Sequence, residues 1–104
     1  EGEVYEVAYK QDIALGKAYI ISEVSGERVE YEIEIESLDY SGDEENKGIL
    51  FKVTDERLLD LTGGIVQGMS GSPIIQNGKM IGAVTHVFVS DASMGYGIFI
   101  EKML

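Results

Sequence analysis

The stretch GGIVQGMSGSPIIQNGKMIGAVTHVFV, residues 63–89, decides the fold of this chain. At its centre, residues 68–73 read Gly-Met-Ser-Gly-Ser-Pro, with Ser70 as the first serine. Glycines on both sides let backbone approach closely, so a group attacked by the Ser70 hydroxyl can reach main-chain N–H donors. Ser70 is therefore the candidate nucleophile; the alternative is a plain surface turn. A β-branched residue in place of Gly71 is expected to crowd this turn and to strain its backbone.

The residues that follow predict a β-hairpin. Two apolar runs, residues 74–75 and 80–84, are joined by Gln-Asn-Gly-Lys at residues 76–79. Asn-Gly between apolar runs is the strongest short-range hairpin signal, because both residues tolerate the positive φ that a two-residue turn needs. The candidate nucleophile is thus expected in a loop that leads directly into a buried hairpin.

Outside this stretch the chain predicts short strands and one brief helix. Apolar residues alternate with glutamates over residues 29–36, which is typical of a half-buried antiparallel strand. A helix is expected near 55–61, with Thr54 or Asp55 as N-cap and Gly63 as its stop. The remaining elements are a strand or ordered tail at 1–12 and strands at 16–24, 49–53, 85–89 and 96–100. Six or seven short strands with one helix predict an all-β fold, a small antiparallel β-barrel.

The composition limits the function classes. With 104 residues, of which 44% are hydrophobic and 26% charged, the chain is a folded domain or part of one. Eight basic and nineteen acidic residues give a net charge of -11, which argues against nucleic acid or an anionic membrane as partner. Basic peptide segments remain suitable partners. The absence of cysteine excludes disulfides and thiolate metal sites.

The acidic residues predict neither a metal site nor a cofactor. The glutamates of residues 29–36 stand two apart along a strand, about 7 Å from one another, which is too far for chelation without further ligands. A solvated strand face is therefore expected. The acidic loop at residues 41–47 lacks the ligand spacing of a calcium loop.

A known family accounts for a larger part of the pattern. Residues 68–73 fit the Gly-x-Ser-Gly-x-Pro serine loop of chymotrypsin-like double-barrel proteases, and residues 95–101 read GYG-x-x-I-E. From residue 52 to 104, and more loosely from 16 to 40, the chain resembles the SpoIVB-type serine peptidases of spore-forming bacteria. The resemblance implies that residues 1–104 are the C-terminal, nucleophile-bearing part of a peptidase domain, the second half of a double barrel.

The resemblance also implies site residues. The family order is His, Asp, Ser, and Asp55, fifteen residues before Ser70, stands where the family's aspartate stands. The alternative role of Asp55 is a helix N-cap, and Asp60 is the competing carboxylate. Charge on the scissile carbonyl oxygen needs donors about 3 Å away, and the main-chain N–H groups of Gly68 and Ser70 are the expected oxyanion hole.

The histidine departs from the family order. His86 is the only histidine and follows Ser70, whereas the family's catalytic histidine precedes the aspartate. Because the chain begins at Glu1 without an initiator Met, we expect a trimmed fragment whose base lies upstream, and which is inactive alone. By the same resemblance, Thr85 and His86 lie in the strand that lines the substrate cleft, where Thr85 can bond the aspartate. The alternative is a structural histidine.

The family implies a serine endopeptidase that signals in sporulation. Such an enzyme is secreted from the forespore into the space between the two membranes, and it carries a peptide-binding PDZ domain upstream. It cleaves a membrane-bound regulator of an intramembrane protease and so triggers late sigma-factor processing. The implied partners are this protein substrate and the upstream half of the same peptidase domain. The alternative is a non-catalytic peptide-binding barrel module.

Overall fold

The computed structural model describes residues 6–23, 25–39, 48–62, 69–87 and 93–100. Its elements are β1 (Glu6–Val7), the 3-10 helix η1 (Lys10–Asp12), β2 (Gly16–Ser22), β3 (Val29–Leu38), β4 (Ile49–Val53), α1 (Glu56–Thr62), β5 (Pro73–Gln76), β6 (Lys79–Val87) and β7 (Met94–Phe99). The predicted strands within these ranges and the predicted helix are confirmed, with small shifts at their ends. Among the described helices, none has the length and apolar character that a membrane crossing requires.

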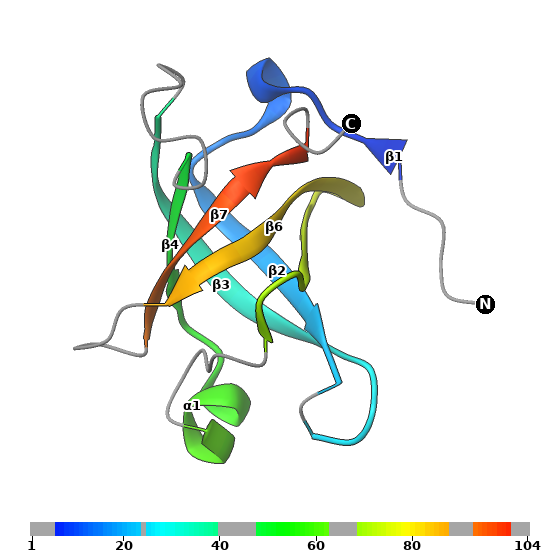
Figure 1. Ribbon diagram of the computed structural model, residues 1–104, viewed down its shortest axis with the longest axis vertical. Coiled ribbons are helices and arrows are strands. Elements are labelled where there is room, and N and C mark those ends of the chain that lie inside the picture. Colours follow the sequence, from blue (N-terminus) through cyan, green and yellow to red (C-terminus); the bar gives the residue numbers. More distant parts are fainter. Residues whose placement is uncertain (1–5, 24, 40–47, 63–68, 88–92, 101–104) are drawn as a thin grey trace.

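Strands β2 to β7 form a closed antiparallel barrel. The order around the ring is β6-β5-β2-β3-β4-β7, and β7 pairs with β6 again. Figure 1 shows these strands around a common interior, with α1 at the lower end. β1 lies outside the ring and runs parallel to the start of β6. The closed barrel confirms the predicted all-β fold and is consistent with the chymotrypsin-like plan.

The alternating pattern of β3 separates the core from solvent. Its inward residues are buried, namely Tyr31, Ile33 and Ile35. Among its outward glutamates, Glu34 pairs in register with Lys17 on β2 and with Lys52 on β4. Opposite charges on adjacent strands are weakly stabilising. The predicted acidic face is therefore a solvated surface on which two lysines flank the central glutamate.

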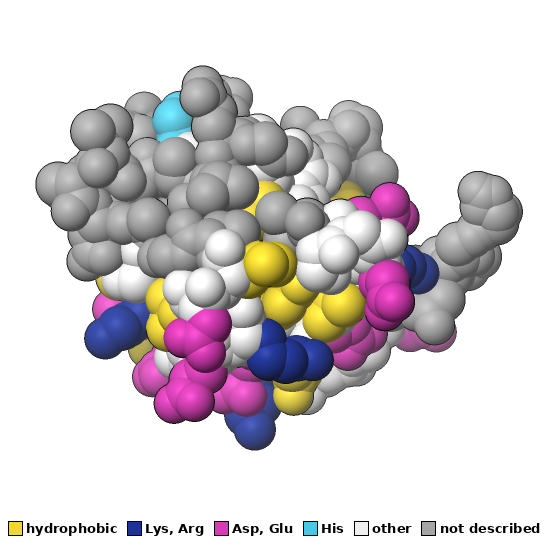
Figure 2. Space-filling view, turned by 90° about the horizontal axis from the view of Figure 1, so that it is seen from below, with side chains coloured by type: hydrophobic (Ala, Val, Ile, Leu, Met, Phe, Trp, Pro, Cys, Tyr) yellow, Lys and Arg dark blue, Asp and Glu magenta, His cyan; other side chains and the backbone are white. Residues whose placement is uncertain are grey.

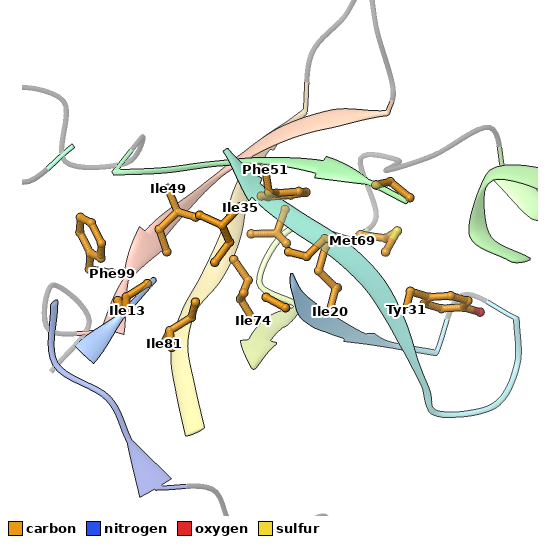
Figure 3. Packing of buried hydrophobic residues seen from close by; sticks show 14 of the residues in the cluster. Ile13, Ile20, Tyr31, Ile35, Ile49, Phe51, Met69, Ile74, Ile81 and Phe99 are labelled. Atoms are coloured by element: carbon orange, nitrogen blue, oxygen red, sulfur yellow. The ribbon is translucent and has the colours of Figure 1, made fainter. Parts of the chain in front are cut away.

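The barrel interior is filled mainly by aliphatic side chains and by two phenylalanines. Ile20, Ile33, Ile49, Phe51, Leu58, Ile74, Ile81 and Phe99 are among its fully or almost fully buried members. Met69, the residue directly before the candidate nucleophile, is also buried. Figure 3 shows Met69 and Tyr31 at the end of this core nearest α1. Core packing therefore fixes the chain immediately before Ser70.

The predicted hairpin is formed by β5 and β6. Gln76 pairs with Lys79, and between them Asn77 has φ 54° and Gly78 has φ 77°. Positive φ at both central residues defines the type I′ turn that matches the twist of antiparallel strands. The Asn-Gly signal in the sequence is thus confirmed in its detailed geometry.

The buried side chain of Gln76 ties the first third of the chain to this hairpin. Its amide oxygen accepts from the Ala14 N–H at 3.0 Å, and its amide nitrogen donates to the carbonyls of Ala14 at 2.8 Å and Lys17 at 3.1 Å. Buried main-chain groups need such partners, because an unpaired one costs about 1–3 kcal/mol. Nothing in the local sequence pattern predicted this contact.

Candidate active site

Ser70 occupies a tight turn at the α1 end of the barrel. The Ser72 N–H donates to the Met69 carbonyl at 3.0 Å, and Gly71 has φ +91°. A turn with positive φ only at its third residue is a type II turn, in which Ser70 is the second residue. Ser70 is exposed while Met69 is buried. The candidate nucleophile is therefore presented to solvent directly beside a residue held in the core.

Strand β6 holds this turn in place. The Gly71 N–H donates to the Val84 carbonyl at 2.7 Å, and the Val84 N–H donates to the Ser72 carbonyl at 2.9 Å. Both bonds lie within the barrel wall, two residues before His86. A reactive group on such a rigid element is positioned more precisely than one on a long loop.

The prediction that a side chain at Gly71 would be crowded is wrong. A Cβ built on Gly71 meets none of the described residues within 4 Å, and Gly71 is exposed. Only the backbone requirement remains, because φ +91° is unfavourable for every residue with a Cβ, at about 1–2 kcal/mol. Glycine is required here by the turn conformation and not by a close neighbour.

No described residue is hydrogen-bonded to the Ser70 hydroxyl, and this includes Asp55 and His86. The expected oxyanion hole of Gly68 and Ser70 is only partly covered, because Gly68 lies outside the described residues. That pairing stays a prediction. The described residues thus position the nucleophile turn without joining it to a base.

Asp55 lies at the start of α1 with an almost fully buried carboxylate. Oδ1 accepts from the Arg57 main-chain N–H and from Arg57 Nε, both at 2.9 Å. Oδ2 accepts from Arg57 Nη2 at 2.7 Å and from the Glu32 N–H at 2.9 Å. The bond to the Arg57 N–H is that of an N-cap, which confirms this expected role. All four acceptor positions of the carboxylate are occupied.

Arg57 is a residue of this site that the sequence analysis missed. Besides pairing with Asp55, its Nη2 donates to the Glu30 carbonyl at 2.8 Å. Its guanidinium also lies 5.4 Å from the centre of the Tyr31 ring, which is within cation–π range. Arg57 therefore ties α1 to β3. A local signal existed, because an arginine two residues after an N-cap aspartate can fold back onto it.

The pairing keeps Asp55 charged. The hydrogen bonds from the Arg57 side chain lower the pKa of Asp55 well below its usual range, against the opposing effect of burial. The N–H groups of Glu32 and Arg57 lower the pKa further. The same pair raises the pKa of Arg57. Asp55 is thus ionised under all conditions in which a serine peptidase works.

This lowered pKa makes stability depend on pH. A carboxyl whose pKa is lower in the folded state stabilises the fold above the unfolded-state pKa of about 4, and that stabilisation is lost as pH falls toward the folded-state pKa. We expect the free energy of unfolding in urea to fall below about pH 4 more steeply for the native chain than for Asp55→Ala. Asp60→Ala, at an exposed position of the same helix, is the control. Equal slopes for the native chain and Asp55→Ala would contradict this role.

The two predicted cleft residues lie at the end of β6. The Thr85 hydroxyl donates to the Tyr96 carbonyl at 3.3 Å, and His86 Nδ1 lies 3.1 Å from Thr85 Oγ1. The chain's single histidine is exposed and lies at the edge of the face that Figure 2 shows from the α1 end. The expected bond from Thr85 to Asp55 stays a prediction, as does substrate contact by His86. Within the described residues, no group of three or more acidic or histidine side chains is arranged to hold a metal ion.

The comparison with protein families identifies a family for this chain. A family model described as SpoIVB peptidase S55 matches residues 1–104, the whole length of the chain. Comparisons with curated proteins and with solved structures gave no match. The matched region includes the Ser70 turn, the Asp55–Arg57 pair, and Thr85 and His86 on β6.

Proposed function

Because this chain belongs to the SpoIVB peptidase S55 family, we propose that it is the C-terminal part of a serine endopeptidase domain with Ser70 as nucleophile. One observation carries the proposal. Ser70 is exposed at a type II turn that is fixed on one side by the buried Met69 and on the other by hydrogen bonds to Val84. A peptidase nucleophile needs this combination of access and rigid placement.

The proposed chemistry is acyl transfer in two steps. Ser70 Oγ attacks the scissile carbonyl carbon and passes its proton to a general base, which then protonates the departing amine. The Gly68 and Ser70 N–H groups stabilise the oxyanion in both steps. Water next attacks the acyl-enzyme, the base takes its proton, and Ser70 recovers the hydrogen when the acid product leaves.

The base in this proposal is a histidine outside the 104 residues. Two points support it. In the resembled family the catalytic histidine precedes the aspartate, and in this chain His86 contacts Thr85 instead of Ser70 or Asp55. Asp55 would orient the incoming imidazole and stabilise its charged form. Since the acceptor positions of Asp55 are full, the imidazole must replace a contact of Arg57. The Arg57 side chain is 63% exposed and therefore has room to move aside.

The biological role is proposed from the family. The enzyme would be secreted from the forespore into the intermembrane space, where it cleaves a membrane-bound regulator of an intramembrane protease and triggers late sigma-factor processing. The net charge of -11 supports a substrate with a basic segment around the cleavage site, because opposite charge speeds encounter.

A fluorophosphonate probe tests the chemistry. We expect Ser70-dependent labelling of the longer protein that contains the upstream half of the domain, and no labelling of the 104-residue chain, because an unassisted serine is a weak nucleophile. Ser70→Ala in both lengths is the control.

Either of two results would change the proposal. Robust Ser70-dependent labelling of the 104-residue chain would place the base within this chain. An unlabelled, folded longer protein that still binds peptides would favour the non-catalytic barrel module instead.

A further inference from the structure

A short relay of hydrogen bonds fixes the ring of His86. The Thr85 hydroxyl donates its hydrogen to the Tyr96 carbonyl on β7. The same oxygen lies 3.1 Å from His86 Nδ1. A hydroxyl has one hydrogen to give and lone pairs with which to accept, so toward His86 it is the acceptor. When the hydroxyl gives its hydrogen to Tyr96, Nδ1–H donates to the hydroxyl oxygen, and in this tautomer of the neutral ring Nε2 is the acceptor.

An irregularity in the sheet directs this ring outward. In the ladder between β6 and β7, Val84 pairs with Gly97 and His86 pairs with Tyr96, so Thr85 is an extra residue on β6. Such β-bulges re-aim side chains and are frequent at barrel rims and beside active sites. Val84 is buried, Thr85 is half-buried and His86 is exposed. The bulge thus places the hydroxyl within the wall and the imidazole at the surface.

The relay stands next to the nucleophile turn. Val84 is bonded to both Gly71 and Ser72, and β6 continues from Val84 to His86 antiparallel to the segment that leads back to Ser70. Two residues of extended strand span about 7 Å. His86 therefore lies about that far along β6 from Val84, the residue that holds the nucleophile turn, and in the proposed active site its Nε2 would face a substrate side chain near the bond that Ser70 attacks.

We infer that His86 is a specificity-determining residue, whose Nε2 accepts a hydrogen bond from a substrate side chain bearing an N–H donor, such as lysine, arginine or glutamine. This rests on the proposed function. Thr85 is the positioning residue, because it holds the ring in the one neutral form that offers an acceptor there. The acidic character of the chain favours the cationic members of this class.

The tautomer is measurable without any activity. The chain has one histidine, so a long-range ¹H–¹⁵N spectrum of the 104-residue chain at about pH 9, above the reference imidazole pKa, shows a single ring. We expect the Nδ1–H form to predominate in the native chain and in Thr85→Ser, which keeps the hydroxyl. Thr85→Val should lose this predominance. A predominant Nε2–H form in the native chain would overturn the relay, and so would an unchanged ratio of the two forms in Thr85→Val. Neither result depends on peptidase activity.

The substrate preference is tested in the longer protein. The test uses two peptides that differ at one residue beside the scissile bond. One peptide has glutamine there, which carries an N–H donor, and the other has methionine, which is similar in length but has no such donor. We expect the ratio of their kcat/KM values to fall about threefold to tenfold in His86→Phe, the loss of one hydrogen bond. Thr85→Val should lower the same ratio and Thr85→Ser should restore it. An unchanged ratio in His86→Phe would overturn the specificity role, while a protein inert toward both peptides would contradict the proposed function.

Discussion

Asp55→Asn is expected to lower the turnover of the longer, histidine-containing peptidase by about 10⁴-fold, the loss that the same change causes in the serine-protease precedent. Asparagine keeps the shape of the side chain and caps a helix as well as aspartate does. It removes the negative charge that stabilises the imidazolium of the missing base. The effect is measured as the rate of peptide cleavage per folded enzyme, with the folded fraction taken from a urea unfolding curve of each variant.

The structure adds a second consequence to this substitution. The carboxylate accepts bonds from Glu32 and from three nitrogens of Arg57, so the amide group of asparagine would turn a donor toward other donors. A buried donor without an acceptor costs about 1–3 kcal/mol, so the variant is also expected to be less stable. Arg57→Met separates the two effects, because it breaks the ion pair and leaves the charge of Asp55 in place. We expect Arg57→Met to lose stability with a much smaller fall in turnover.

The competing carboxylate provides the decisive comparison. Asp60 is exposed on α1, and Asp60→Asn should leave turnover near the native value. A near-normal rate for Asp55→Asn together with a large loss for Asp60→Asn would show that Asp60 is the aspartate of the triad. Equal large losses in Asp55→Asn and Arg57→Met would show that the ion pair acts structurally.

Gly82→Ala is expected to lower the free energy of unfolding by about 3 kcal/mol or more, a larger loss than for the other variants proposed above. A Cβ on Gly82 would lie 2.0 Å from the main-chain oxygen of Ile98 and 3.1 Å from Ile49 Cδ1. The oxygen belongs to β7, which pairs with β6 to close the barrel, so it cannot move without opening that pairing. The free energy of unfolding in urea measures the change.

Gly78→Ala is the matched control for this prediction. Both variants add a methyl group to a glycine of the β5–β6 hairpin, but Gly78 has φ +77° and a Cβ there meets none of the described residues within 4 Å. Only conformational strain of about 1–2 kcal/mol is expected. A Gly82→Ala variant as stable as Gly78→Ala would show that β6 and β7 tolerate a wider separation.

The sequence by itself determined the features that depend on neighbouring residues. The hairpin turn follows from Asn77 and Gly78, because their tolerance of positive φ is a property of the residues themselves. The buried and exposed sides of β3 follow from its period of two, and the start of α1 follows from Asp55 as N-cap. Ser70 could be identified as a candidate because its turn depends on the neighbouring glycine, whose tolerance of positive φ is also a property of the residue itself. The fold class and the tight turn that carries Ser70 were therefore predictable.

The tertiary structure alone decided which distant groups meet. Arg57 binds Asp55 while it reaches Glu30 and Tyr31 on another strand, and Gln76 holds main-chain groups of the segment before β2. The need for glycine at position 82 likewise arises from the carbonyl of a strand that returns later in the chain. Such contacts carry no local period, because their geometry exists only once the barrel has closed. The bond from Glu32 to Asp55 and the contact of the His86 ring in the barrel wall were for this reason beyond the reach of the sequence.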